Sequence, residues 1–253
     1  MTDNSAKAVD LYETARVMMI TAQSLRGDKA ELDMNMSLIY GSLGDAYQSL
    51  GDVPKWKESL TESLNLLKGL VAADPDNSEF ARYLGWAHQA LGSFHMNQND
   101  WKPALEQYQA CLSVRQKLAS EDSSDWIYQY DLAWAHHLLG NYYFGSGGND
   151  PDNAAKHYEV AYEIRDQLTQ ADPSNKRWQK DFALSAETIG DIAERKGDHE
   201  TAEQNYKASR SILRDLVDAD PTNGGWTSLL SDITKKISRM ESTKTPAEAL
   251  GVH

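Results

Sequence analysis

One phrase recurs four times along this 253-residue chain in a fixed register, and it limits the possible folds more than any other feature. Its glycines are Gly44, Gly92, Gly140 and Gly190, which are 48, 48 and 50 residues apart. Two further series keep this register: the aspartates Asp52, Asp100, Asp150 and Asp198, and the aromatic residues Phe80, Tyr128, Trp178 and Trp226. Self-similarity at a fixed period is typical of repeat architectures. We therefore expect an array of stacked units.

Each period contains two helical patterns. In the first, apolar or aromatic residues occur at offsets 0, 4, 7 and 11, as in Leu132, His136, Leu139 and Tyr143. This spacing forms one face of an α-helix and does not fit a strand. A glycine inside a helix is unfavourable by about 1 kcal/mol relative to alanine. Its recurrence predicts a neighbouring helix that approaches too closely for any side chain.

The boundaries between the two helices are also marked. The first helix is predicted to end at a residue type that readily adopts the left-handed conformation: Gly51, Asn99, Asn149 or Gly197. The aspartate that follows each of these residues is suited to N-cap the second helix. The second helix carries a small residue, a tyrosine and another small residue, as in Ala104, Tyr108 and Cys111. Cys111 therefore fills a packing position, and we do not expect it to be a nucleophile.

The register predicts four full repeats between two half-repeats, with ten helices. Ala8, Tyr12 and Ala15 match the second-helix pattern with no first helix before them, whereas Lys235, Lys236 and Arg239 suit a solvated capping helix at the other end. The predicted segments are a half-repeat helix at 6–27, repeats at 28–75, 76–123, 124–173 and 174–221, a capping helix at 222–241 and a disordered tail at 242–253.

The amino-acid composition limits the classes of partner that the chain is expected to bind. The chain has 38 Asp and Glu against 25 Lys and Arg, a formal net charge of -13, which argues against nucleic acid and against anionic membranes. It favours basic or neutral partner surfaces, although an acidic surface also simply keeps a protein dispersed. A single cysteine suits a reducing compartment. Neither a signal peptide nor a run of about 20 apolar residues is present, so we expect a cytoplasmic protein.

The repeated residues resemble a known family. The phrase Tyr40-x2-Leu43-Gly44-x2-Tyr47, with a later Ala-x3-Tyr, is similar to the tetratricopeptide repeat, whose pattern W-x2-L-G-x2-Y, A-x3-F, P spans 34 residues. The longer period resembles the long-helix variety of kinesin light chains and of bacterial arrays, and the resemblance covers roughly residues 8 to 240. It implies an all-α, right-handed superhelical solenoid of antiparallel helix pairs. Trp56 and Leu60 depart from the pattern, so packing should differ in the first full repeat.

The resemblance also implies a concave groove, lined by the first helix of each repeat, that binds a peptide or a partner helix. The side chains expected in it are Leu38, Asp45, Trp86, Gln89, Ser93, Met96, Trp134, His137, Asn141, Phe144, Glu187, Asp191 and Glu194. The middle repeats thus offer Trp, Met and Phe anchors, while Glu187, Asp191 and Glu194 form an acidic row. A second interpretation stays open, in which Trp86 and Trp134 pack against the adjacent repeat.

The sequence gives less support to a metal site, to an enzyme active site or to the binding of acidic C-terminal tails. His88, His95 and His136 stand where the first repeat has tyrosine, which indicates packing and no metal site. Nucleophile, zinc-protease and phosphate-loop motifs are absent from the sequence, so we expect neither an enzyme nor a cofactor. Chaperone adaptors of the family hold a C-terminal carboxylate with Lys, Asn and Arg, but the matching positions here include Gly41 and Asp45. Binding of acidic C-terminal tails is therefore not expected.

These features predict a non-enzymatic protein-interaction module whose groove binds a peptide or partner helix of basic or apolar character. One alternative is a structural scaffold in which copies of the chain associate into a homo-oligomer. Another is the sensor or adaptor part of a bacterial signalling system, because arrays of this kind accompany signalling or effector domains in bacterial proteins. The sequence names no particular partner.

Overall fold

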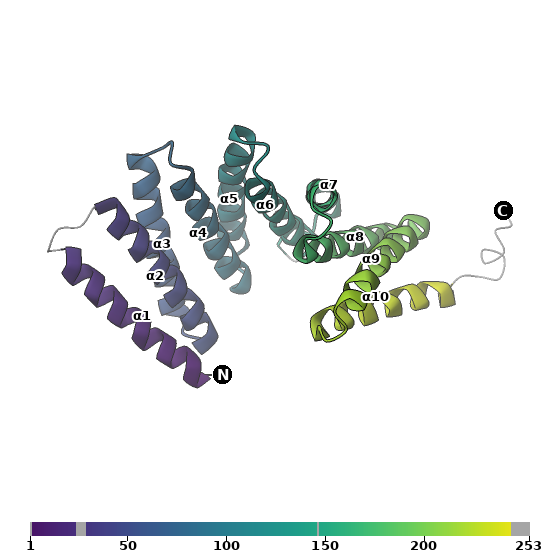
Figure 1. The fold of residues 1–253 in the computed structure, drawn as a ribbon, viewed down its shortest axis with the longest axis horizontal. Coiled ribbons are helices and arrows are strands. Elements are labelled where there is room, and N and C mark those ends of the chain that lie inside the picture. Colours follow the sequence, from purple (N-terminus) through teal and green to yellow (C-terminus); the bar gives the residue numbers. More distant parts are fainter. Residues whose placement is uncertain (1, 24–28, 146, 244–253) are drawn as a thin grey trace. The chain divides into compact units, whose positions relative to one another are not determined.

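The structure, a computed structural model, describes residues 2–23, 29–145 and 147–243. Within these ranges the chain forms ten α-helices and no strands, which confirms the all-α prediction and the helix count. The helices are α1 (Thr2–Gln23), α2 (Lys29–Leu50), α3 (Val53–Ala73), α4 (Ser78–Asn97), α5 (Trp101–Glu121), α6 (Trp126–Phe144), α7 (Pro151–Ala171), α8 (Lys176–Lys196), α9 (His199–Ala219) and α10 (Gly224–Thr243) (Figure 1). Most of the predicted tail lies outside the described residues, as do residues 24–27 of the predicted first helix.

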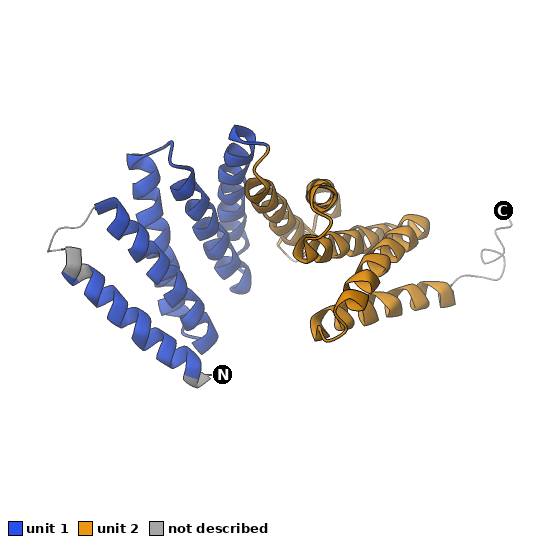
Figure 2. Ribbon diagram, viewed as in Figure 1, with its two compact units in different colours: residues 1–123 blue, residues 124–253 orange. Residues whose placement is uncertain are grey.

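The helices group into two compact units. Unit 1 (residues 1–123) holds α1 to α5, and unit 2 (residues 124–253) holds α6 to α10 (Figure 2). Inside each unit the main contacts join helices that follow one another in the chain. Such nearest-neighbour packing is how a solenoid is stabilised. Each unit is therefore a stack of helix pairs.

The left-handed conformation predicted between the helices is confirmed at all four residues, although α4 already ends at Asn97 and α6 at Phe144. Gly51, Asn99, Asn149 and Gly197 have φ values of 75°, 57°, 44° and 81°, all in the left-handed region. Asp52, Asp150 and Asp198 each accept a hydrogen bond from a backbone N–H in the first turn of the next helix. Asp100 is the exception, because its carboxylate lies 3.0 Å from Nδ1 of His95 and makes no capping bond. The sequence therefore specifies where each repeat turns.

The recurring glycines mark close approach of the second helix, as predicted. A Cβ atom at Gly92, Gly140 or Gly190 would lie 2.6 Å from the ring of Tyr108, Tyr158 or Tyr206, respectively. In the first full repeat the neighbour is aliphatic, since a Cβ at Gly44 would lie 2.7 Å from Cδ2 of Leu60. Packing in that repeat does differ, as the departure at Leu60 predicts.

Histidines fill positions inside the helix pairs. His88, His95 and His136 are buried, which agrees with the packing interpretation. Nδ1 of His88 lies 2.7 Å from Oε1 of Gln107. At the same register one repeat later, Nδ1 of His136 lies 3.0 Å from Nδ1 of His157. Burial, with a smaller contribution from the charge of His157, lowers the pKa of His136 to about 4, and burial also lowers the pKa of His157.

The glycine contacts predict opposite effects of one substitution at two sites. Gly140→Ala should lower the free energy of unfolding by about 1–2 kcal/mol, because overpacking against the Tyr158 ring exceeds the gain in helix propensity. Gly41→Ala should raise it by up to about 1 kcal/mol, because no atom lies within 4 Å of the new Cβ. Urea denaturation measures both. Equal effects at the two sites would contradict the close-approach explanation.

The histidine pair predicts acid sensitivity. Because the folded pKa values lie below the unfolded value of about 6.5, the unfolded state binds more protons as the pH falls. The two histidines therefore do not lower the free energy of unfolding above about pH 6.5, and they lower it progressively as the pH falls toward about 4. His157→Gln, which reproduces the His88–Gln107 pairing, should reduce the fall in urea midpoint between about pH 7 and about pH 5. The same substitution at the exposed His199 is the control, and an equal reduction there would refute the prediction.

Candidate functional site

An open pocket of about 260 Å³ lies in unit 1, between the first helices of two consecutive repeats. Helices α2 and α4 form its sides and α3 forms its floor. Its lining residues are Ser37, Leu38, Gly41, Ser42 and Asp45 of α2, Leu60, Ser63 and Leu67 of α3, and Tyr83, Trp86, Ala87 and Ala90 of α4. Three of the expected groove residues, Leu38, Asp45 and Trp86, therefore share one pocket.

The apolar rim of this pocket is formed by Leu38 and Trp86, whose exposed fractions are 41% and 37%. The guanidinium carbon of Arg82 lies 4.5 Å from the centre of the Trp86 ring, and Tyr83 packs edge-on against the same ring at 4.9 Å. Trp86 thus packs on its own helix and also lines the pocket. Large apolar side chains that stay this exposed are typical anchor sites of interaction surfaces.

Asp45 is the one charged residue of the lining. It is exposed, yet the surrounding protein raises the pKa of its carboxyl by desolvation. Among the described residues, none makes a hydrogen bond or an ion pair with its carboxylate. Next to it, Gly41 leaves open space, since no atom lies within 4 Å of a Cβ built there.

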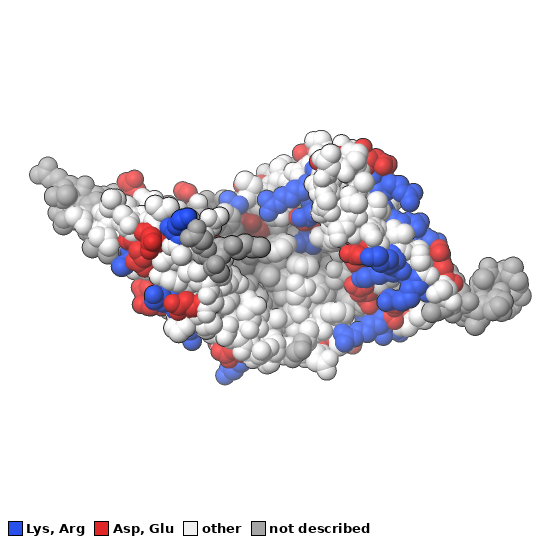
Figure 3. Space-filling model, turned by 90° about the horizontal axis from the view of Figure 1, so that it is seen from below, with Lys and Arg blue, Asp and Glu red and all other residues white. Residues whose placement is uncertain are grey.

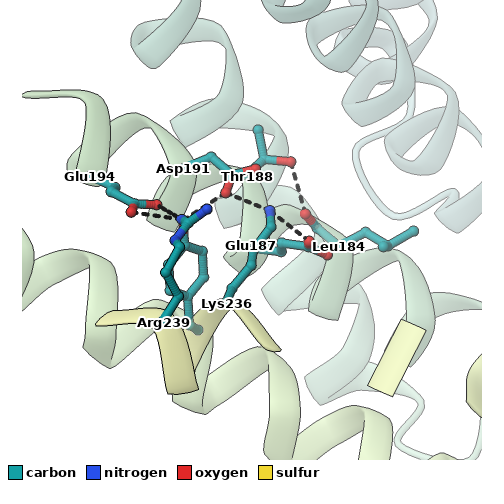
Figure 4. A network of polar contacts seen from close by, with 8 residues as sticks. Leu184, Glu187, Thr188, Asp191, Glu194, Lys236 and Arg239 are labelled. Carbon is teal, nitrogen blue, oxygen red and sulfur yellow. Dashed lines mark hydrogen bonds and ion pairs between the residues drawn. The ribbon is translucent and has the colours of Figure 1, made fainter. Parts of the chain in front are cut away.

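The acidic row of α8 has partners within the chain, by contrast. Nζ of Lys236 lies 2.9 Å from the carboxylate of Glu187 and 2.5 Å from that of Asp191, and Nη2 of Arg239 lies 2.7 Å from that of Glu194 (Figure 4). Burial alone lowers the pKa of Lys236, but its hydrogen bonds to Asp191 and Glu187 raise it overall. Lys236 and Arg239 were expected to be solvated, and instead they connect α10 to α8.

A phenol completes this network. The hydroxyl of Tyr206 lies 2.6 Å from Oδ1 of Asp191 and 2.8 Å from Oε2 of Glu194. Burial and these two carboxylates raise the pKa of Tyr206. On the face of unit 2 seen in Figure 3, acidic and basic side chains are interspersed and do not form separate acidic and basic patches. All three carboxylates of the row are therefore engaged by side chains of the same unit.

The tyrosine of the second helix makes a similar contact in the middle repeats. The hydroxyl of Tyr108 lies 3.2 Å from Oγ of Ser93, and that of Tyr158 donates to Oδ1 of Asn141 at 2.6 Å. Ser93, Asn141 and Asp191 each directly follow the recurring glycine. Because the tyrosine packs on that glycine, its hydroxyl reaches the next residue on the groove side of the first helix.

Two buried arginines replace leucine in the floor of the middle repeats. Arg115 and Arg165 stand at the register of Leu67, which lines the pocket of unit 1. Nη2 of Arg115 donates to Oε1 of Gln89 at 2.6 Å, and Nη1 of Arg165 donates to Oγ of Ser185 at 2.5 Å. These arginines are not among the side chains expected from the sequence, although the repeat pattern shows the change from Leu to Arg.

The remaining groove residues pack on one another or on these cations. The ring of Trp134 lies 5.4 Å from that of His137 and 5.8 Å from the guanidinium of Arg165. Burial, with a further contribution from Arg165, lowers the pKa of His137 to about 4, while Asp181 acts in the opposite direction. His137 is therefore neutral at neutral pH.

The guanidinium of Arg195 lies 4.7 Å from the ring of Phe144, and Met96 is half-buried on α4.

Two further properties concern the described part of the chain. Across residues 2–23, 29–145 and 147–243, no three His, Cys, Asp or Glu side chains come together as ligands for a metal ion. None of the helices in these ranges combines the length and the apolar character that crossing a bilayer requires.

No protein-family model and no curated protein matches the chain. Among solved structures, BtubC (BKLC) from P. vanneervenii is 21% identical, with a TM-score of 0.65 over 84% of this chain and 74% of that chain. The apo form of RapI is 13% identical, with a TM-score of 0.61 over 93% of this chain and 77% of that chain. TTC0263, a thermophilic TPR protein in Thermus thermophilus, is 15% identical, with a TM-score of 0.48 over 92% of this chain and 99% of that chain.

At these identities the likeness concerns the fold alone. The helix pairs of the two units repeat in the register of their glycines, and Tyr108, Tyr158 and Tyr206 of the second helices pack on the glycines of the first. The chain thus has a tetratricopeptide-like fold, an all-α array of repeated helix pairs.

Proposed function

We propose that the chain is a non-enzymatic protein-interaction module that binds a peptide or a partner helix on the side lined by the first helices of its repeats. The open pocket between α2 and α4 carries this proposal. It combines exposed apolar anchors, Leu38 and Trp86, with polar lining residues such as Asp45, and that combination suits recognition of a protein segment.

The same lining argues for binding and against catalysis. The hydroxyl of Ser37 donates to the carbonyl oxygen of Met34 at 2.7 Å, and that of Ser63 donates to the carbonyl oxygen of Ser37 at 2.9 Å. A serine nucleophile needs an adjacent general base, and none of the lining residues is a histidine. The hydroxyl of Ser37 therefore bonds within α2, and that of Ser63 joins α3 to α2.

The proposal is tested by filling the pocket without disturbing the fold. Peptides selected from a displayed random library against the intact chain are the probe. Gly41→Leu should weaken their binding by at least about tenfold, because the new side chain enters the open space beside Leu38 and removes the apolar subsite. The substitution also removes a helical glycine, so folding should be retained. Fluorescence anisotropy of labelled peptides measures the affinity.

Gly69→Leu is the matched control. Gly69 lies on α3, has no atom within 4 Å of a built Cβ and is not part of the pocket lining. Both variants gain the same side chain and the same helix propensity. If both bind the selected peptides as the parent chain does, the pocket is not the binding site.

A specific observation favours self-association as a second function. Leu11 and Met18 of α1 are 71% and 65% exposed. Two repeats later, the same register holds Gln107 and Val114, which contact the first helix of their own repeat. The exposed side of α1 thus has the character of a surface on which a further helix packs, and a second copy of the chain can provide that helix.

If copies of the chain associate, the average molecular mass in solution should rise with the protein concentration. Leu11→Glu combined with Met18→Glu should shift the average mass measured by light scattering toward the monomer, because a buried carboxylate in the contact is unfavourable. Leu50→Glu, at an exposed leucine on α2, is the control. A parent chain that stays monomeric over a wide concentration range would rule this function out.

A further inference from the structure

The unpartnered carboxylate of Asp45 becomes informative when it is compared with Asp191, its equivalent in the last full repeat. Both directly follow the recurring glycine of a first helix. Asp191 accepts a hydrogen bond from the hydroxyl of Tyr206 and forms an ion pair with Lys236. The positions that correspond to these two partners in the repeat of Asp45 hold Leu60 and Ala90.

Neither Leu60 nor Ala90 can donate a hydrogen bond or carry a charge, and both line the pocket. The carboxylate of Asp45 therefore lacks both interactions that its counterpart makes. Desolvation by the surrounding protein raises the pKa of Asp45, and an opposite charge placed beside it would favour the ionised form. Charge complementarity at this position calls for a cation supplied from outside the chain.

The volume of the pocket limits what accompanies that cation. At about 260 Å³ it is smaller than the roughly 300–1,000 Å³ of typical small-molecule sites. It is larger than the roughly 150 Å³ of an apolar cavity that holds benzene. A volume between these limits suits one large apolar side chain.

We propose that this pocket binds a protein segment that inserts an apolar side chain between Leu38 and Trp86 and places a lysine or arginine against the carboxylate of Asp45. The inference rests on the proposed protein-binding function and specifies which side chains the bound segment must carry. The chain contains its own example of the polar half of this contact, since Lys236 binds Asp191 in the equivalent place. The one carboxylate of the lining, that of Asp45, lies on α2, whereas a cation of this chain, Arg82, already lies against Trp86 on α4.

The test uses a peptide array with the intact chain. Every peptide has one central leucine, and each flanking position in turn holds lysine, glutamine or glutamate. At the position that reaches Asp45, lysine should bind about tenfold more tightly than glutamine, and glutamate more weakly than either, because one charge-assisted hydrogen bond is gained or lost. The preference should decrease with added salt, since the pair is partly exposed.

Two variants test whether Asp45 causes the preference for lysine over glutamine. Asp45→Asn removes the charge, and Ala90→Lys places an amine at the register of Lys236 beside Asp45. Each should abolish the preference for lysine over glutamine. Asp76→Asn, in the turn between α3 and α4, changes the net charge equally and should retain the preference.

The outcomes separate this inference from the proposed function. If the leucine peptides bind, Gly41→Leu prevents their binding and lysine, glutamine and glutamate are equivalent at every position, the chain binds protein segments but the inference is wrong. A preference for glutamate, or an equal loss of the lysine preference in Asp76→Asn, also overturns it. If Gly41→Leu leaves the binding unchanged, the pocket itself is excluded.

Discussion

The contact between a glycine of one helix and a tyrosine of the next determines much else in this chain. Because the glycine has no side chain, the ring of Tyr108, Tyr158 or Tyr206 lies directly on the backbone of the preceding helix. That approach fixes how closely the two helices pack. It also carries the phenol hydroxyl through to the groove side, where it meets the residue that follows the glycine. One packing contact therefore sets the spacing of a repeat and the polarity of its surface.

The groove carboxylates show why net charge alone does not define a binding surface. The chain carries a formal charge of -13, yet Glu187, Asp191 and Glu194 are paired with cations of α10. The same helix is held by apolar packing, since Ile233, Ile237 and Met240 are buried in the core of unit 2. A partner would have to displace a docked helix to reach this row. A carboxylate without a cationic partner is thus a property of single positions such as Asp45 in the pocket of unit 1.

Periodicity predicted the fold almost completely and the site only in outline. The offsets of the apolar residues define helix faces, and Gly, Asn and Asp define the turns, so these depend on local sequence alone. The groove positions follow from the same register. The partners of each groove residue do not, because Lys236 reaches Asp191 from 45 residues away and Arg115 reaches Gln89 from another helix. A long side chain can point in several directions, and tertiary packing chooses among them.

The departures from the repeat pattern change the surface chemistry of individual repeats. Leucine in place of tyrosine at Leu60 preserves the close contact with Gly44 but removes the hydroxyl that would reach Asp45. Leucine in place of arginine at Leu67 leaves the floor of the pocket apolar, whereas Arg115 and Arg165 bring buried cations to the same position in the middle repeats. Each change conserves the packing of the helices and alters the side chains that the repeat presents beside its first helix. A repeat array can diversify its partners in this way without changing its fold, because the architecture depends on the glycine contact and the specificity depends on the residues around it.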